Sequence, residues 1–176
     1  MANKITMADI MTPIDQYIHV PFWHSIRQAM AALEKGQKKT EWSSTNRVVL
    51  VFDNAYNLVG AVRRLNLLRG LEPNFLHREA KEQQKSWFPV KDDVSLSVVD
   101  EEKIEQHIKS RSESPIKEVM ESIDEVLSVN DQITKAVFDM AKVPVGVIPI
   151  LDEKSVVGIV TIDELFKAVT KIVVES

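Results

Sequence analysis

A hydroxyl and two carboxylates lie close together near the end of the chain, at Thr161, Asp163 and Glu164. They follow the apolar residues 158–160 and open a helical pattern, which places them at the expected junction of a strand and a helix. A hydroxyl beside the free amides of a helix start suits a phosphate, and a carboxylate can accept two hydrogen bonds from a diol. Residues of these types suit a polar ligand, and no set of titratable groups in the sequence suggests catalysis.

The same residues also have a purely structural interpretation. Thr161 and Glu164 match a capping box, in which a threonine and a glutamate three residues later satisfy the exposed backbone donors of a helix start. Such a cap stabilises a helix by about 1 kcal/mol. Both interpretations stay open, because a capping threonine can also face a ligand.

The elements that must position these residues occur twice in the chain. Met11 and Met120 each end a short helical segment, and Val20 follows Met11 at the spacing at which Val129 follows Met120. An amphipathic helical pattern comes next in both copies, with apolar residues at positions i, i+3, i+4 and i+7. These residues are Ile26, Ala29, Met30 and Leu33 in the first copy and Ile133, Ala136, Val137 and Met140 in the second.

Each copy continues with two apolar runs around a polar turn, the pattern of a β-hairpin. The runs are residues 47–53 and 58–62 in the first copy, and residues 147–152 and 156–160 in the second. A helical pattern over residues 64–71 or 162–174 closes each copy. The sequence therefore predicts an α+β fold of two βαββα repeats, which pack as an intramolecular pair because one repeat alone buries too little apolar surface.

A long polar segment separates the two copies. We expect residues 1–71 to form the first repeat, residues 72–114 an inter-repeat insert, and residues 115–176 the second repeat. Within the insert, residues 74–86 and 100–111 have helical patterns. Because inserts of this length are often functional, we expect it to pack on the repeats or on a partner.

The second copy resembles the CBS (cystathionine-β-synthase-type) domain family. Residues 149–152, with the sequence PILD, are similar to the family's apolar strand ending in Asp, and residues 158–165, GIVTIDEL, to its Gly-h-h-Thr/Ser-x-x-Asp-Leu motif, where h is apolar. The resemblance implies a Bateman module, a non-catalytic regulatory and signal-transduction module. Such modules bind an adenine nucleotide (AMP, ADP or ATP) or S-adenosylmethionine between the repeats, require no cofactor, and commonly form homodimers that act on a regulated protein.

The resemblance also implies roles for individual residues. Thr161 takes the position that contacts phosphate or ribose, Glu164 takes the place of the ribose-binding Asp, and Asp163 falls one residue before it. In the first copy Arg63 and Asn66 occupy these two positions; Arg63 can reach a phosphate, or it can be a surface residue beside a degenerate pocket. The candidate nucleotide-binding residues are Thr161, Glu164, Asp163, Pro149, Ile148, Met120, Arg63 and Asn66. We expect at most one working site, near Thr161.

Composition excludes several other classes. The net charge of −4 and the lack of a dense basic face argue against nucleic-acid binding, although Arg63, Arg64 and Arg69 could meet a small anion or simply form a solvated helix face. The absence of cysteine excludes thiolate metal sites, and the scattered histidines, His19 and His24 among them, make a poor metal site.

Location and partners follow from similar arguments. No stretch approaches the roughly 20 apolar residues that span a bilayer, so we expect a cytoplasmic protein. We expect the last helix to provide the dimer contact through Leu165, Phe166, Val169 and Ile172. The alternative function is a structural or protein-interaction module without a ligand, favoured by the altered residues at the motif positions.

Overall fold

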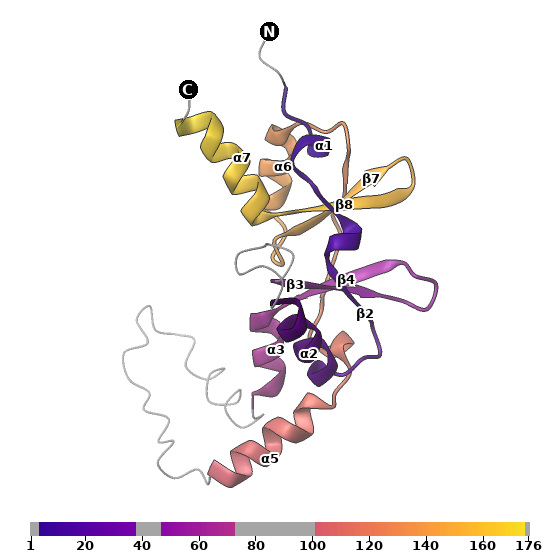
Figure 1. Cartoon of the computed structure of the whole chain (residues 1–176), viewed down its shortest axis with the longest axis vertical. Helices are drawn as coiled ribbons and strands as arrows, with labels where there is room; N and C mark the ends of the chain where they lie inside the picture. Colours follow the sequence, from indigo (N-terminus) through magenta and orange to yellow (C-terminus); the bar gives the residue numbers. More distant parts are fainter. Residues whose placement is uncertain (1–3, 38–46, 73–100, 175–176) are drawn as a thin grey trace.

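The computed structural model describes residues 4–37, 47–72 and 101–174. Its elements are, in order, α1 (Met7–Ile10), β1 (Thr12–Pro13), η1 (Ile14–Gln16), β2 (Ile18–Pro21), α2 (Ile26–Gln37), β3 (Val48–Phe52), β4 (Leu58–Arg63), α3 (Arg64–Leu71), α5 (Glu101–Ser112), η4 (Ile116–Glu118), β5 (Glu121–Ser122), β6 (Leu127–Ser128), α6 (Ile133–Met140), β7 (Val147–Asp152), β8 (Ser155–Thr161) and α7 (Ile162–Val174). Two four-stranded sheets face each other, and helices cover the outer side of each (Figure 1).

The elements form two series with the order strand, helix, strand, strand, helix, which confirms the predicted pair of βαββα repeats. In each repeat the first strand pairs in parallel with the second, and the second and third form an antiparallel hairpin. Both hairpins shift register at equivalent places, between Val51 and Phe52 and between Ile150 and Leu151. The duplication therefore extends to the irregularities of the strands.

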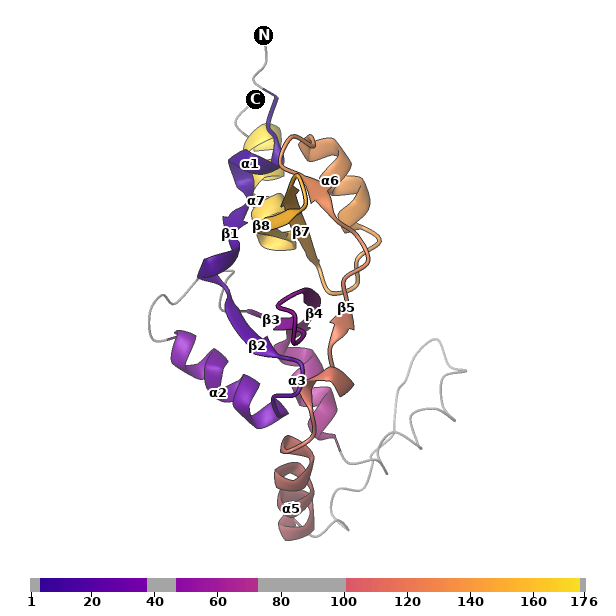
Figure 2. The same ribbon diagram turned by 90° about the vertical axis from the view of Figure 1, so that its right-hand side faces the viewer.

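Each sheet is completed by a short strand from the segment that precedes the other repeat. Strand β1 precedes the first repeat but pairs with β8 of the second, where Thr12 lies opposite Ile159. Strand β5 precedes the second repeat but pairs with β4 of the first, where Glu121 lies opposite Ala61. In Figure 2, β1 lies beside the sheet of the second repeat, and β5 lies lower in the view, beside the sheet of the first repeat. The two repeats thus exchange their N-terminal strands.

Gly158 and Gly60 permit this exchange. A Cβ atom on Gly158 would lie 2.7 Å from Met11 Sδ and 3.0 Å from the carbonyl oxygen of Thr12. A Cβ atom on Gly60 would lie 2.8 Å from the carbonyl oxygen of Glu121. Non-bonded carbon atoms rarely approach other atoms this closely, so glycine at these positions lets the exchanged strand lie against the sheet without displacement.

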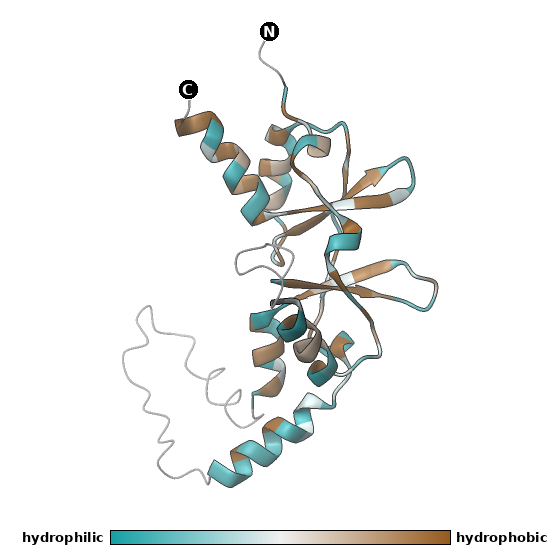
Figure 3. Cartoon of the chain, in the orientation of Figure 1, coloured by the Kyte–Doolittle hydropathy of each residue, from teal (hydrophilic) through white to brown (hydrophobic). Residues whose placement is uncertain are grey.

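The central strands are apolar on both faces because each sheet is covered on both sides. All of β3 is buried: Val49 and Val51 face the helices of the first repeat, whereas Leu50 and Phe52 face the other sheet. The cluster between the sheets consists of Tyr17, Val48, Leu50, Phe52, Ala61, Val145, Val147 and Ile159. Figure 3 shows the resulting contrast between the mostly hydrophobic strands and the mostly hydrophilic α5. This cluster makes the two repeats one packed unit.

Helix α5 covers most of the second helical pattern expected in the insert, and it packs on the first repeat. Arg111 Nε donates a hydrogen bond to the carbonyl oxygen of Gly70 at 3.1 Å, and Arg27 pairs with Glu113 at 3.0 Å. The other helical pattern, over residues 74–86, lies outside the described residues. The division into residues 1–71, 72–114 and 115–176 remains a prediction about sequence units.

The outward face of α7 differs from the expected one. Leu165 is only 5% exposed and belongs to the core of the second repeat, so the prediction that it provides a dimer contact is wrong. Val169 also packs partly against that core. Phe166, in contrast, is 73% exposed, and Ile172 is 46% exposed. A buried side chain on a helix of this pattern faces its own sheet, which leaves Phe166 and Ile172 as the outward residues among the four that were expected to form the contact.

Candidate functional site

Thr161 ends β8, and Glu164 lies in the first turn of α7. The backbone N–H of Thr161 donates to Glu164 Oε2 at 2.8 Å, and the Thr161 hydroxyl donates to the same oxygen. Thr161 is buried, so its donors require partners inside the protein. The carboxylate of Glu164 supplies them, and the structure thus contains the glutamate half of a capping box.

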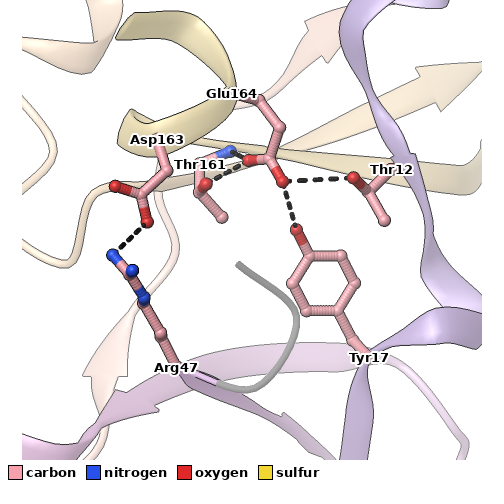
Figure 4. Close-up of polar contacts among 6 residues, drawn as sticks. All are labelled: Thr12, Tyr17, Arg47, Thr161, Asp163 and Glu164. Carbon is pink, nitrogen blue, oxygen red and sulfur yellow. Dashed lines mark hydrogen bonds and ion pairs between the residues drawn. The ribbon is translucent and has the colours of Figure 1, made fainter. Parts of the chain in front are cut away.

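The second carboxylate oxygen of Glu164 binds the N-terminal segment. Glu164 Oε1 accepts a hydrogen bond from the hydroxyl of Thr12 at 3.1 Å and a long one from the hydroxyl of Tyr17 at 3.5 Å (Figure 4). Thr12 belongs to the exchanged strand β1, and Tyr17 is buried between the sheets. Glu164 therefore joins the start of α7 to the exchanged strand and to the inter-sheet core.

Asp163 points from the same helix turn toward the first repeat. Its Oδ2 atom pairs with Arg47 Nη1 at 3.0 Å, with both side chains about half exposed (Figure 4). Arg47 lies directly before β3 of the first repeat. This ion pair crosses from one repeat to the other beside Thr161, so the polar groups near α7 come from both halves of the chain.

The first copy holds an equivalent set of side chains at the start of α3. The backbone N–H of Arg63 donates to Asn66 Oδ1 at 2.9 Å, as Thr161 donates to Glu164. Asn66 Nδ2 then donates to Glu121 Oε1 at 2.7 Å, and Arg63 Nη2 approaches the same oxygen at 3.4 Å. Arg63 Nε is buried and has no hydrogen-bond partner among the described residues.

The two sets use opposite hydrogen-bond polarity. In the second copy the helix carries the carboxylate, Glu164, and the exchanged strand carries the donor, Thr12. In the first copy the helix carries the donor, Asn66, and the exchanged strand carries the carboxylate, Glu121. The sequence interpretation placed Asn66, an amide, at the position of the ribose-binding Asp but missed that Glu121 supplies a carboxylate there. The repeat alignment contained the signal: Glu121 follows Met120 as Thr12 follows Met11, so the two residues occupy equivalent positions.

Two other candidate residues, Ile148 and Met120, lie away from the polar groups around Thr161. Ile148 is fully buried in the core of the second repeat, on the helix side of its sheet. Pro149, its neighbour on β7, is buried opposite Ile159 and by strand alternation faces the first repeat. Met120 packs on the core of the first repeat, with its sulfur over Gly60. The structure therefore brings Thr161, Asp163 and Glu164 together and separates them from Ile148 and Met120.

The described residues offer no competing metal site or membrane span. Within residues 4–37, 47–72 and 101–174, no group of three or more histidine, aspartate or glutamate side chains is placed to hold a metal ion. The ring of His19 instead lies 2.8 Å from the carbonyl oxygen of Ile14 and 3.1 Å from the hydroxyl of Tyr56. Over the same ranges, no helix combines the length and the apolar character that crossing a bilayer requires.

Solved structures share this architecture over nearly the whole chain. A CBS-pair protein of Arabidopsis thaliana, CBSX2, superposes with a TM-score of 0.62 and 17% identity, over 97% of this chain and 97% of that one. The same protein in complex with AMP gives 0.57 and 18%, over 95% and 97%. The CBS domain of a CBS-domain-containing membrane protein from Sphaerobacter thermophilus gives 0.61 and 17%, over 93% and 87%.

No model of a protein family matches the sequence, and neither does any curated protein. At identities of 17–18% the structural likeness is a likeness of fold. The two sheets, the paired repeats and the coverage of both chains agree with it. The chain therefore has the fold of a tandem CBS-domain pair, as the resemblance in its second copy predicted.

Proposed function

We propose that this chain is a regulatory module that binds an adenine nucleotide or a related adenosyl ligand between its repeats, near Thr161. One observation carries the proposal: at the start of α7, beside the bonded pair Thr161 and Glu164, Asp163 forms an ion pair with Arg47 from the other repeat. A ligand placed there touches both repeats at once. The complex of a similarly folded protein with AMP supports the choice of ligand class.

The phosphate end of the ligand has three kinds of donor within reach. The amides of α7 that follow Ile162 are suited to a phosphate at a helix start, and the Thr161 hydroxyl can join them by turning away from Glu164. The Arg47 guanidinium can hold a phosphate with two parallel hydrogen bonds. Its present partner is Asp163, and because an exposed ion pair contributes only about 0–1 kcal/mol, exchange for a phosphate costs little. Glu164 is the acceptor for ribose hydroxyls.

Regulation follows from the position of the ligand between two packed units. A ligand shifts the pose of the repeats only if it binds one pose more tightly than the other. Release of Arg47 from Asp163 provides such a difference, because that ion pair is a polar link between the repeats. The Thr161 hydroxyl is buried and already donates to Glu164, so we propose binding without catalysis.

Titration of the full chain with AMP, ADP, ATP and S-adenosylmethionine, followed by calorimetry, tests the ligand. We expect saturable binding of at least one of them, and Thr161→Val should weaken it about tenfold, the effect of losing one hydrogen bond to a charged group. The matched control is Thr134→Val on α6, where the threonine is exposed. If Thr161→Val binds the ligand with the same affinity as Thr134→Val, the ligand lies elsewhere.

A module without a small ligand is the second candidate, and one observation favours it. The carboxylate of Glu164 already accepts hydrogen bonds from Thr161, Thr12 and Tyr17, so ribose hydroxyls must compete with the protein's own donors. In that case the polar set serves only to hold the exchanged strand. The absence of heat and of a melting shift with all four compounds at millimolar concentration would favour this function over sensing.

We further propose that the chain forms a homodimer through the outward helices of its second repeat. Phe138 on α6 and Phe166 on α7 are 68% and 73% exposed, and apolar exposure of this kind marks a contact surface. Phe166→Asp should raise the dimer Kd at least about tenfold in sedimentation equilibrium. Val126→Asp, at a 49% exposed valine before β6, is the control and should leave the mass unchanged. A wild-type monomer would exclude the dimer.

A further inference from the structure

A groove of about 430 Å³ runs between the N-terminal segment and α7. One wall is a single stripe of α7, at the helical spacing of i, i+3, i+4 and i+7: Glu164, Lys167, Ala168 and Lys171. The other wall comes from the segment that includes α1 and β1. A groove of this size is in the range of small-molecule sites in proteins.

The groove has apolar walls between its polar groups. Ile5 and Ile10 line it from the N-terminal segment, and Ala168 lines it from α7. Both isoleucines are only partly buried, although they pack against the core of the second repeat. Part of their apolar surface therefore remains available to an occupant, whose burial there is favourable in proportion to the area covered.

The two carboxylates that line the groove already accept hydrogen bonds, whereas its two lysines have no acceptor among the described residues. Asp9 Oδ2 already accepts hydrogen bonds from the backbone N–H and the hydroxyl of Thr6, which lower the pKa of Asp9. Glu164 is held by its three donors, Thr161, Thr12 and Tyr17. The ammonium groups of Lys167 and Lys171, in contrast, form no hydrogen bond or ion pair within the part of the chain that the structure describes.

The two lysines lie one helical turn apart on the stripe that lines the groove. Each ammonium group brings three donors, and together they suit a carboxylate, sulfonate or phosphate group. We infer that this groove binds a small organic anion with an apolar body, its acidic group at Lys167 and Lys171 and its body against Ile5, Ile10 and Ala168. This site extends along α7, away from Arg47 and Asp163, and is separate from the proposed nucleotide site.

The two sites share one wall. Thr12 and Glu164 line the end of the groove and also form the hydrogen bond that holds the exchanged strand to α7. An anion bound along α7 therefore lies beside the same bond that borders the inter-repeat site. Occupancy of the groove should stabilise the docked position of the N-terminal segment, because the ligand contacts both walls.

Titration of the full, isotope-labelled chain with octanoate, followed by amide NMR shifts, tests the inference. We expect saturable shifts below about 10 mM that map to residues 5–12 and 164–171. The double variant Lys167→Ala/Lys171→Ala should weaken binding about tenfold or more, since each lysine provides a charge-assisted hydrogen bond. The matched control is Lys117→Ala/Lys154→Ala, at two exposed lysines outside the groove, and should bind octanoate as the wild type does.

Two further probes separate the contributions of the anion and the apolar body. Acetate and 1-octanol should each bind at least about tenfold more weakly than octanoate, because each lacks one of the two groups. Equal binding of octanol, undiminished binding in the double-lysine variant, or shifts confined to the surface around Phe138 and Phe166 would overturn the inference. Loss of octanoate binding in the presence of saturating AMP would place it in the nucleotide site instead, and an unsuccessful AMP titration alone leaves the octanoate result unaffected.

Discussion

Replacing Gly158 by alanine should lower the free energy of unfolding by about 2 kcal/mol, measured by urea denaturation. The added Cβ atom would meet Met11 Sδ at 2.7 Å and the carbonyl oxygen of Thr12 at 3.0 Å. The methionine can move, but the backbone of β1 cannot do so without losing its pairing with β8. Forcing an extra carbon into such a contact costs roughly 1–3 kcal/mol.

Two variants make this test specific to the exchanged strand. Gly36→Ala, near the end of α2, should leave stability unchanged or raise it, because alanine is the better helix former. Met11→Ala should recover only part of the loss caused by Gly158→Ala, because the Thr12 backbone remains in contact. A Gly158→Ala protein as stable as the wild type would show that β1 does not dock against β8 in solution.

Replacing Glu164 by alanine should also destabilise the protein by about 2 kcal/mol. The change removes the acceptor for the backbone and hydroxyl donors of Thr161, which is buried, and for the hydroxyl of Thr12. A buried donor left without an acceptor costs about 1–3 kcal/mol. Urea denaturation of Glu164→Ala and Thr12→Val, singly and together, measures how much of the loss passes through the bond between them.

The same Glu164 variant tests whether Glu164 itself contacts a bound nucleotide. If Glu164 binds ribose, Glu164→Ala should weaken nucleotide binding about tenfold at a temperature where the variant remains folded. If Glu164 serves only to hold Thr12 and Thr161, the variant should lose nucleotide affinity only because it is less stable. A second substitution that stabilises the fold independently should then restore that affinity. The control is Glu153→Ala, at an exposed turn of the β7–β8 hairpin, which should change neither stability nor affinity. If the effects of Glu164→Ala and Thr12→Val on stability simply add, that result would contradict the hydrogen bond between Glu164 and Thr12.

The paired polar sets explain why the repeats tolerate such different residues at their motif positions. One carboxylate is present in each set, on α7 in the second copy and on β5 in the first. An exchange of donor and acceptor between two facing positions preserves the bond, whereas a change at one position alone would leave a polar group without a partner. Asn66 and Glu121 are therefore best treated as one unit, which no inspection of a single repeat identifies.

The sequence by itself determined the repeat order and the bounds of the closing helices. Those features depend on local patterns: the helical spacing of Ile26, Ala29 and Leu33, and the apolar runs of β3 and β7 on either side of turns. Local patterns of this kind are set by which face each element buries, and they recur in both copies. The fold could be recognised from them without any knowledge of contacts.

Only the tertiary structure decided which strand completes which sheet and which polar groups meet. Strands β1 and β5 have two residues each, too few for a period, so neither their partner nor their register can be read from sequence. The same limit applies to the apolar residues that were given functional roles. Leu165 and Ile148 are apolar like their neighbours, and only packing shows that both face the core of the second repeat. Glu121 gained its role from a contact with Asn66 across the exchange. In the same way Glu164 and Asp163, found first by their spacing, acquired Thr12 and Arg47 as partners.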